Sequence, residues 1–270
     1  MQQGSVEGEP NLIQKLYWPR LPWIVRVEAP IRPRRRSISD RPYGLFCPTS
    51  KASEVLNPRW TIQILGELWD GSTRFNEIRR GLPGISPTLL AKRLKEMQEN
   101  GLVERVADPA SGAIDYIRTK KAAELDPILQ GLARWAQRHI RAEFALVDRD
   151  ADVLMWTVHR RINQAALPKR RIVMRFNFTD ATSPASTYWL MIKPDAPVEL
   201  CVSDPGFEVD LFIETSVQVF TGIYLGRRSA AREIAEDRLF MSGEARLERT
   251  FERWLRISTY ADVEGLLTAD

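Results

Sequence analysis

The segment SPTLLAKRLKEMQENG, residues 86–101 of the 270-residue chain, defines a helix more sharply at both ends than a surface helix needs. Ser86 is a favoured N-cap residue, and Pro87 suits the first helical position, where a missing N–H is harmless. The Asn-Gly pair at the other end predicts a left-handed stop. Apolar residues at spacings of four and three predict an inward stripe at Leu90, Leu94 and Met97. The opposite face then carries Thr88, Lys92 and Lys95.

The residues before this helix predict two further helices and a short extended piece. A first short helix is expected to end at Asn57, which also caps a second helix beginning at Pro58. The second helix has a buried face at Trp60, Ile64, Leu65 and Leu68, and Gly71 ends it. Residues 73–75 are expected to be extended, and Asn76 to cap the helix that follows.

The residues after this helix predict a two-stranded hairpin and a long helix. Extended runs surround Pro109 and Gly112, and ELDPILQGLARWAQRHI has the spacing of a helix with Ile128, Leu132 and Trp135 on one face. Residues 43–141 therefore have the element order of a winged helix-turn-helix domain. The motifs YGLFCP, PRWTIQILGELWDGSTRFNEIRRGLPGISPTLLAKRLKEMQENGLVER and LARWAQ resemble the HxlR family of transcriptional regulators. The run IRTKKAAEL departs from the LTELG-like pattern expected after the second wing strand, which leaves that junction open.

The capped helix has the features of a DNA-reading helix. A helix about 10–12 Å across fits the major groove, where its N-terminal side chains meet base edges. The first two turns hold Ser86, Thr88, Leu89, Lys92 and Arg93. We expect Lys92 to contact a base and Lys95, Arg74 and Arg79 to contact phosphates. The alternative is that all of these are only solvated polar positions.

The hairpin tip, residues 108–113, would serve as the wing, with Arg105 and Arg118 beside it as candidate phosphate contacts that Asp108 and Asp115 oppose. The final helix of this domain, with the segment around Phe46, is the expected homodimer surface, through Leu129, Leu132, Trp135 and Ala136. Two reading helices would then meet a palindromic site about 34 Å apart. Cys47 is either a redox-sensing thiol, as the resemblance implies for some members, or a packed small apolar residue.

Residues 1–42 are predicted to be a disordered basic arm, rich in Pro and Arg. Its run Arg34–Arg36 could lie along phosphates, could be a solvated tail, or could precede the true start. The basic excess lies in the first half: residues 1–42 hold 8 Lys or Arg against 4 Asp or Glu, residues 43–141 hold 15 against 11, and residues 142–270 hold 16 against 20. Such an asymmetry favours a polyanionic partner for the first half.

The second half changes pattern from helical to alternating. RIVMRFNFT predicts a half-buried strand, with Ile172, Met174, Phe176 and Phe178 on its inner face. TYWLMI, VELCV and FEVDLFIET predict further strands, the last with Phe207, Val209, Leu211 and Ile213 inward. Helices are expected in VLMWTVHRRINQ, VQVFTGIYLGRRSAAREIAE and ARLERTFERWLRIST. The fold class is therefore α+β, with a mainly antiparallel sheet in residues 150–265.

DPGFEVDLFI, VFTGIYLG and LFMSGEARLERTFERWL resemble the sterol carrier protein type 2-like lipid-binding domain, over most of residues 150–262. The resemblance implies a tunnel for an apolar molecule. Its candidate lining residues are Trp156, Trp189, Met191, Phe212, Phe220, Tyr224, Phe240 and Trp254. Each of them could equally be an ordinary core residue.

These features predict a DNA-binding transcriptional regulator, a repressor or an activator, that is dimeric and responds to an apolar small molecule. The alternative is a lipid or hydrophobe carrier whose winged helix only mediates association. An enzyme is not expected, because the sequence offers two histidines, no Cys/His cluster, no Gly-rich phosphate loop and no nucleophile elbow. No metal or cofactor is expected. Two cysteines, no leader and no span of about 20 apolar residues predict a cytoplasmic protein without a membrane span.

Overall fold

The computed structural model describes residues 43–109, 111–140 and 150–263, and the chain divides into two compact units, residues 1–59 and 60–270. The predicted arm, residues 1–42, lies outside the described residues. In the first unit, helix α2 (Pro48–Leu56) begins after Cys47, and Asn57 Nδ2 donates to Tyr43 Oη at 2.7 Å. No helix in the described ranges is long and apolar enough to cross a bilayer.

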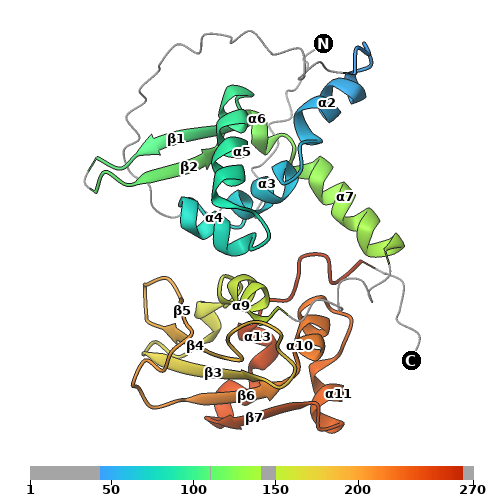
Figure 1. The fold of residues 1–270 in the computed structure, drawn as a ribbon. Helices are drawn as coiled ribbons and strands as arrows, with labels where there is room; N and C mark the ends of the chain where they lie inside the picture. The colour runs from blue at the N-terminus through green and yellow to red at the C-terminus, as the bar shows by residue number, and fades with distance from the viewer. Residues whose placement is uncertain (1–42, 110, 141–149, 264–270) are drawn as a thin grey trace, which may run out of the picture. The chain divides into compact units, whose positions relative to one another are not determined.

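The second unit begins with the helices and hairpin that the sequence predicts, in the predicted order, and adds one short helix, α6, that was not predicted (Figure 1). Their bounds are α3 Thr61–Trp69, α4 Phe75–Gly81, α5 Pro87–Glu99, β1 Val103–Ala107, β2 Ile114–Arg118, α6 Lys120–Ala123 and α7 Asp126–His139. Strands β1 and β2 pair in antiparallel fashion, with Arg105 opposite Tyr116. The core of this part is apolar and contains Ile64, Leu65, Ile78, Leu90, Leu94, Met97 and Leu102.

Two predicted helix starts were wrong. Asn57 has helical backbone angles and ends α2, so it cannot cap a helix at Pro58; α3 begins at Thr61, after Trp60 at a left-handed φ of 82°. Helix α4 begins at Phe75 rather than after Asn76. Its first turn is capped from within the helix, because Glu77 Oε2 accepts from the backbone N–H groups of Thr73 and Arg74, both at 3.0 Å.

The junction that departs from the family pattern forms the short helix α6. Thr119 Oγ1 accepts from Ala122 N at 3.1 Å and donates to the carbonyl oxygen of Gly101 at 2.7 Å. One side chain therefore caps α6 and attaches it to the end of α5. The unexpected sequence IRTKKAAEL therefore alters the connection between β2 and α7, and helix α7 still forms after it.

The rest of the second unit is a five-stranded sheet in the order β5-β4-β3-β6-β7, with helices on one face (Figure 1). Its elements are α9 Ala151–His159, the 3₁₀ turn Gln164–Ala166, β3 Ile172–Phe178, β4 Thr187–Ile192, β5 Glu199–Cys201, β6 Leu211–Thr215, α10 Val217–Tyr224, α11 Ala230–Ala235, β7 Leu239–Gly243, α12 Ala245–Arg249 and α13 Phe251–Trp254. Among the strands in the described residues only β3 and β6 pair in parallel, so the predicted mainly antiparallel sheet and the α+β class are confirmed.

The main core lies between this sheet and its helices. The inner face of β3 contributes Ile172, Met174, Phe176 and Phe178, as predicted, and they pack with residues of α9, α10 and α13. The opposite face is not simply solvated. Val173, which the alternation places outward, is buried against Trp189 and Met191 there. Strand β3 is thus covered on both faces near its start.

Two parts of the sheet differ from the sequence prediction. Strand β6 begins at Leu211, and Phe207 is 39% exposed, with the Arg171 guanidinium 3.9 Å from its ring centre. Just before β6, Asp210 Oδ2 accepts from Val173 N at 2.8 Å. Strand β7 was not predicted. Its last residue, Gly243, has a φ of 151°, and a Cβ there would lie 2.2 Å from the Asp210 carbonyl oxygen.

Candidate nucleic-acid interface

Both predicted ends of α5 are confirmed. Ser86 Oγ accepts from Leu89 N at 3.2 Å, and Pro87 occupies the first position. At the other end, Leu102 N donates to Met97 O at 2.8 Å and Gly101 N donates to Gln98 O at 2.9 Å, with Gly101 at a φ of 70°. These two bonds form a Schellman ending. The length and rotation of α5 are therefore fixed at both ends.

The two faces of α5 are also as predicted. The stripe is buried, and the opposite face is exposed at Ser86, Thr88, Lys92 and Lys95, while Leu89 and Arg93 are half-buried. Arg93 pairs with Glu96, and Lys92 Nζ lies 3.9 Å from the same carboxylate. The Lys92 side chain stays 67% exposed, so this long contact leaves it able to reach another group.

The other candidate DNA contacts lie on α4 and the hairpin. Arg79 on α4 and Arg105 on β1 are exposed. Arg74 Nε forms an ion pair with Asp115 Oδ1 of β2 at 2.7 Å. Arg118, beside the wing, pairs with Asp126 at 2.5 Å. Arg74 and Arg118 thus brace the hairpin against its neighbours, whereas Arg79 and Arg105 face solvent.

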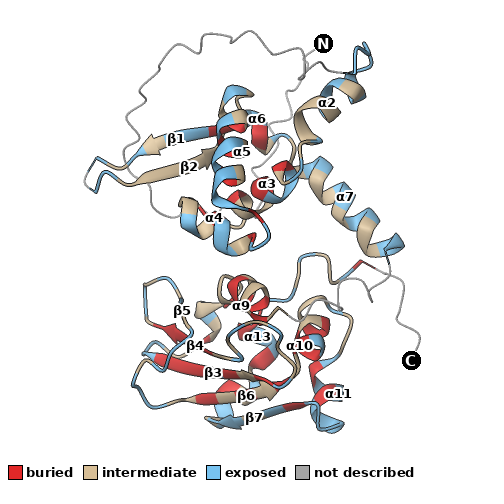
Figure 2. Ribbon diagram, in the orientation of Figure 1, coloured by how far each residue is buried: buried red, intermediate tan, exposed pale blue. Residues whose placement is uncertain are grey.

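Helix α7 contains no buried residue in the single chain (Figure 2). Its apolar side chains lie on one face at helical spacing and are half exposed: Ile128 56%, Leu132 50% and Trp135 56%. Leu129 and Ala136 are partly buried. In the first unit, Phe46 is 99% exposed. The structure thus leaves the predicted dimer surface uncovered in the single chain.

Cys47 is exposed, so its interpretation as a packed apolar residue was wrong. The backbone N–H groups of Ser50 and Thr49, in the first turn of α2, lower the pKa of its thiol. This arrangement stabilises a thiolate, since helix N-terminal N–H groups favour negative charge. Cys201, on β5, is half-buried.

The eight candidate ligand residues fall in different places. Phe220 and Trp254 are fully buried in the main core, and Tyr224 packs against it. Trp189 and Met191 lie on the opposite face of the sheet. Phe212 pairs with the 55% exposed Phe240, their ring centres 6.2 Å apart. Trp156, on α9, borders a pocket.

This pocket has a volume of about 450 Å³ and a mixed lining. Its apolar lining residues are Trp156, Ile162, Pro197 and Val198. Its polar lining residues are Asp70, Ser72, Glu77, His159, Arg160 and Gln164, and Gly71 completes the lining. Burial, and then the nearby Arg160, lower the pKa of His159 to about 4, so its imidazole is neutral at pH 7. Its Nδ1 lies 3.2 Å from the Met155 carbonyl oxygen and so carries the proton.

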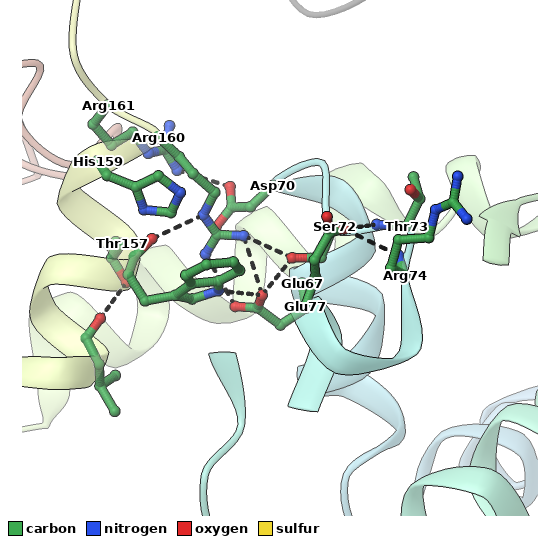
Figure 3. Close-up of polar contacts among 12 residues, drawn as sticks. Glu67, Asp70, Ser72, Thr73, Arg74, Glu77, Thr157, His159, Arg160 and Arg161 are labelled. Atoms are coloured by element: carbon green, nitrogen blue, oxygen red, sulfur yellow. Dashed lines mark hydrogen bonds and ion pairs between the residues drawn. The ribbon is translucent and has the colours of Figure 1, made fainter. Parts of the chain in front are cut away.

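A polar cluster beside this pocket was not predicted from the sequence (Figure 3). Glu67 of α3 accepts hydrogen bonds from Ser72, Trp156 and Arg160. Glu67 and Arg160 are 93 positions apart; Glu67 lies on α3 and Arg160 directly follows α9, two helices whose spacing indicates only an apolar face. The sequence therefore holds no local pattern that pairs them.

Comparison with known proteins identifies the first part of the chain. Residues 55–144 match the family described as HxlR-like helix-turn-helix. The HTH-type transcriptional regulator YvaP of Bacillus subtilis is 39% identical over 101 residues, which are 37% of this chain and 94% of YvaP. The regulator YodB of the same organism is 36% identical over 95 residues, covering 34% of this chain and 85% of YodB.

The chain belongs to the HxlR-like helix-turn-helix family. The solved reduced form of YodB is 34% identical and covers 36% of this chain and 97% of its own, with a TM-score of 0.33. As an HxlR-like protein the chain is a DNA-binding transcriptional regulator. The family match ends at residue 144, before the five-stranded sheet.

Proposed function

We propose that this regulator binds double-stranded DNA as a homodimer, with residues 43–141 as the DNA-binding domain and residues 150–265 as a domain that responds to an apolar small molecule. The observation that carries the DNA-reading part is α5 itself: both ends are fixed, one face is buried, and Thr88, Lys92 and Lys95 project from the other. Base contacts specify a sequence, while phosphate contacts position the protein.

We assign Lys92 to a base edge, with Ser86, Thr88, Leu89 and Arg93 beside it. Lys95, Arg79 and Arg105 are assigned to phosphates; Arg74 joins them only in part, since Asp115 already holds its guanidinium. The dimer assignment rests on the uncovered stripe of α7, because an apolar helical stripe normally packs against something. We propose that this dimer acts as a repressor in the cytoplasm.

Binding titrations on a duplex selected in vitro by the native chain test the DNA contacts. Lys92→Ala should weaken specific binding by about 1–3 kcal/mol and relax preference at one base pair. Lys95→Ala should weaken all sequences alike and reduce the salt slope by about one. Lys169→Ala, at an exposed position outside the helix-turn-helix, is the control. If both α5 variants bind DNA with native affinity and native salt dependence, α5 is not part of the DNA interface.

The effector part of the proposal is supported by the pocket at α9, whose volume lies in the usual range for ligand sites. Trp156, Ile162 and Val198 give it an apolar side. A second apolar region surrounds Phe212 and the exposed Phe240, two residues that the resemblance to sterol carrier domains implies as ligand contacts. Titration of a fluorescent fatty-acid probe into variants of the full chain shows whether the probe binds in the pocket at α9 or at the region around Phe212 and Phe240.

We expect the probe to saturate on the native chain, and Val198→Trp, which fills the pocket, to weaken its binding at least about tenfold, by the loss of a well-packed contact surface. Phe240→Ala should leave probe binding unchanged. The opposite pair of results would place the ligand on the outer face of the sheet. A native chain that shows no saturation, and from which solvent extraction releases no hydrophobic molecule, would contradict the effector proposal.

A further inference from the structure

The Glu67 carboxylate is the centre of a cluster that joins α3, the turn after it and α9. Arg160 donates to it twice, from Nη1 to Oε2 at 3.1 Å and from Nη2 to Oε1 at 3.2 Å. Ser72 Oγ donates to Oε2 at 2.9 Å and Trp156 Nε1 at 3.3 Å. We call Glu67, Ser72, Trp156 and Arg160 the α3–α9 junction (Figure 3).

The junction is shielded from water. The side chains of Arg160 and Glu67 are 14% and 11% exposed, and Ser72 is buried. Arg160 also donates from Nη1 to Ser72 Oγ at 3.0 Å and from Nε to the Trp156 carbonyl oxygen at 3.1 Å. A planar guanidinium held by this many partners has a fixed orientation. Removing either charge leaves its largely buried partner without a countercharge.

Further contacts extend the junction to α4. Arg161, next to Arg160, pairs with Asp70 at the end of α3 at 2.9 Å. The guanidinium of Arg80, on α4, lies 5.0 Å from the centre of the Trp156 ring, in a cation–π arrangement. Trp156 on α9 and the two arginines that follow the helix therefore contact α3, the turn after it and α4.

Close packing of α4 against α3 fixes the Glu67 side chain. A Cβ on Gly81, the last residue of α4, would lie 2.1 Å from Glu67 Cδ, closer than any real contact. The absence of a side chain at Gly81 is what gives the carboxylate its space. A shift of α4 along α3 would therefore displace Glu67 from Arg160.

The junction leads directly into the helix-turn-helix. Ser72 precedes Thr73 and Arg74, whose N–H groups are held by Glu77 at the start of α4. Thr73 Oγ1 donates to Asp115 Oδ1 at 2.7 Å, which ties the same turn to the wing strand β2. The position of Ser72 thus determines where α4 begins and how the wing lies against it.

We propose that Arg160 is a positioning residue for DNA binding: through Glu67 and Ser72 it holds the start of α4, and with it the helix-turn-helix, in the arrangement that binds DNA. This inference rests on the proposed DNA-reading role of α5. It makes α9, outside the family match, part of the DNA-binding machinery. Since Ser72, Trp156 and Arg160 also line the pocket, an occupant of that pocket would act on the junction directly.

The test measures operator affinity, its salt dependence and thermal unfolding for the full-length protein. Arg160→Gln should weaken binding to the selected duplex about tenfold, within the range by which residues outside a ligand contact modulate coupling. The slope of log K against log salt should stay native, because no phosphate contact is lost. Lys95→Ala, in contrast, should change that slope.

Three variants separate positioning from a general loss of stability. Glu67→Gln should resemble Arg160→Gln, and the double variant should be no weaker than either alone, since the two residues act through each other. Ser72→Ala removes one neutral partner and should lower DNA affinity, but by less than Arg160→Gln does. This variant keeps the test available if Arg160→Gln does not fold. Arg170→Gln is the matched control, because Arg170 pairs with Asp210 and Glu244 at an exposed position where strands β3, β6 and β7 begin or end.

A folded Arg160→Gln or Ser72→Ala protein with native affinity would overturn the inference, even if its melting temperature fell. So would an Arg160→Gln variant with a reduced salt slope, which would indicate a direct phosphate contact. A native chain that selects no duplex would instead contradict the proposed DNA-reading role of α5. The two failures are thus distinguishable.

Discussion

At the scale of single residues, Cys47 has the features of a reactive thiol. It is exposed and directly precedes α2 as its N-cap residue, and the backbone N–H groups of Ser50 and Thr49 lower the pKa of its thiol. The nucleophile is the thiolate, so a lowered pKa moves the onset of reactivity to lower pH. We expect Cys47 to alkylate with a rate that rises with pH and reaches half its maximum below the usual thiol value of about 8.5.

Cys201 provides the internal control, because it is half-buried on β5 and packs against the apolar cluster of Val173, Trp189 and Met191. Iodoacetamide labelling followed by peptide mass spectrometry, at several pH values, measures both thiols in one sample. Cys47 should react first at pH 7. Equal rates, or a half-maximum above the usual thiol value, would show that the α2 amides do not activate Cys47.

Residue type predicted some helix starts and missed others for a physical reason. Ser86 acts as the N-cap of α5 because its own hydroxyl reaches an unpaired N–H. Asn76 was an equally good candidate by type, yet Glu77 reaches back to two N–H groups and starts α4 before it. A cap from within the helix competes with a cap before it, and composition alone does not rank the two.

At the scale of elements, the cap of α5 connects stability with DNA binding. Ser86→Ala should lower the free energy of unfolding by about 0.5–2 kcal/mol, because Leu89 N loses its acceptor. Ser86→Asp keeps an acceptor and should retain native stability, but its carboxylate would face the phosphates and weaken binding. Chemical denaturation and DNA titration of both variants measure the two effects. A parallel loss of stability and affinity in both would contradict this separation.

Sheet elements were predicted where alternation was strong. Strand β3 alternates from Met174 to Phe178, so its inner face was identified correctly. Strand β7 is five residues long and ends at a glycine packed against the Asp210 backbone, so its sequence holds little alternation to detect. The early start predicted for β6 failed because Asp210 bonds to β3 just before the strand begins.

At the scale of the whole molecule, the helix-turn-helix was predictable and the α3–α9 junction was not. The first depends on caps and periods that lie within about 20 residues of one another. The second depends on Glu67 meeting Trp156 and Arg160 across about 90 positions, after both helices have folded. Most candidate DNA contacts could be predicted from the pattern of a single helix. The candidate ligand residues could not be predicted in this way, because their location depends on which face of each strand points toward the core.

Assembly gives the prediction with the widest consequence. Trp135 is 56% exposed in the single chain and lies between Leu132 and His139 on the stripe of α7. If two copies bury this stripe together, Trp135→Glu places an unpaired charge in the interface, at a cost of several kcal/mol that one helix pair cannot offset. The variant should sediment as a monomer, keep its circular dichroism spectrum, and lose most of its affinity for a palindromic duplex while retaining weak binding to a half-site.

Arg134→Glu is the matched control for this experiment. It adds a carboxylate to the same helix at an exposed position that lies off the stripe, because residues 134 and 135 differ by about 100° around the helix axis. The control should remain dimeric. A Trp135→Glu protein that still sediments as a dimer would place the interface on another surface, and the half-site spacing would then follow from that surface instead of α7.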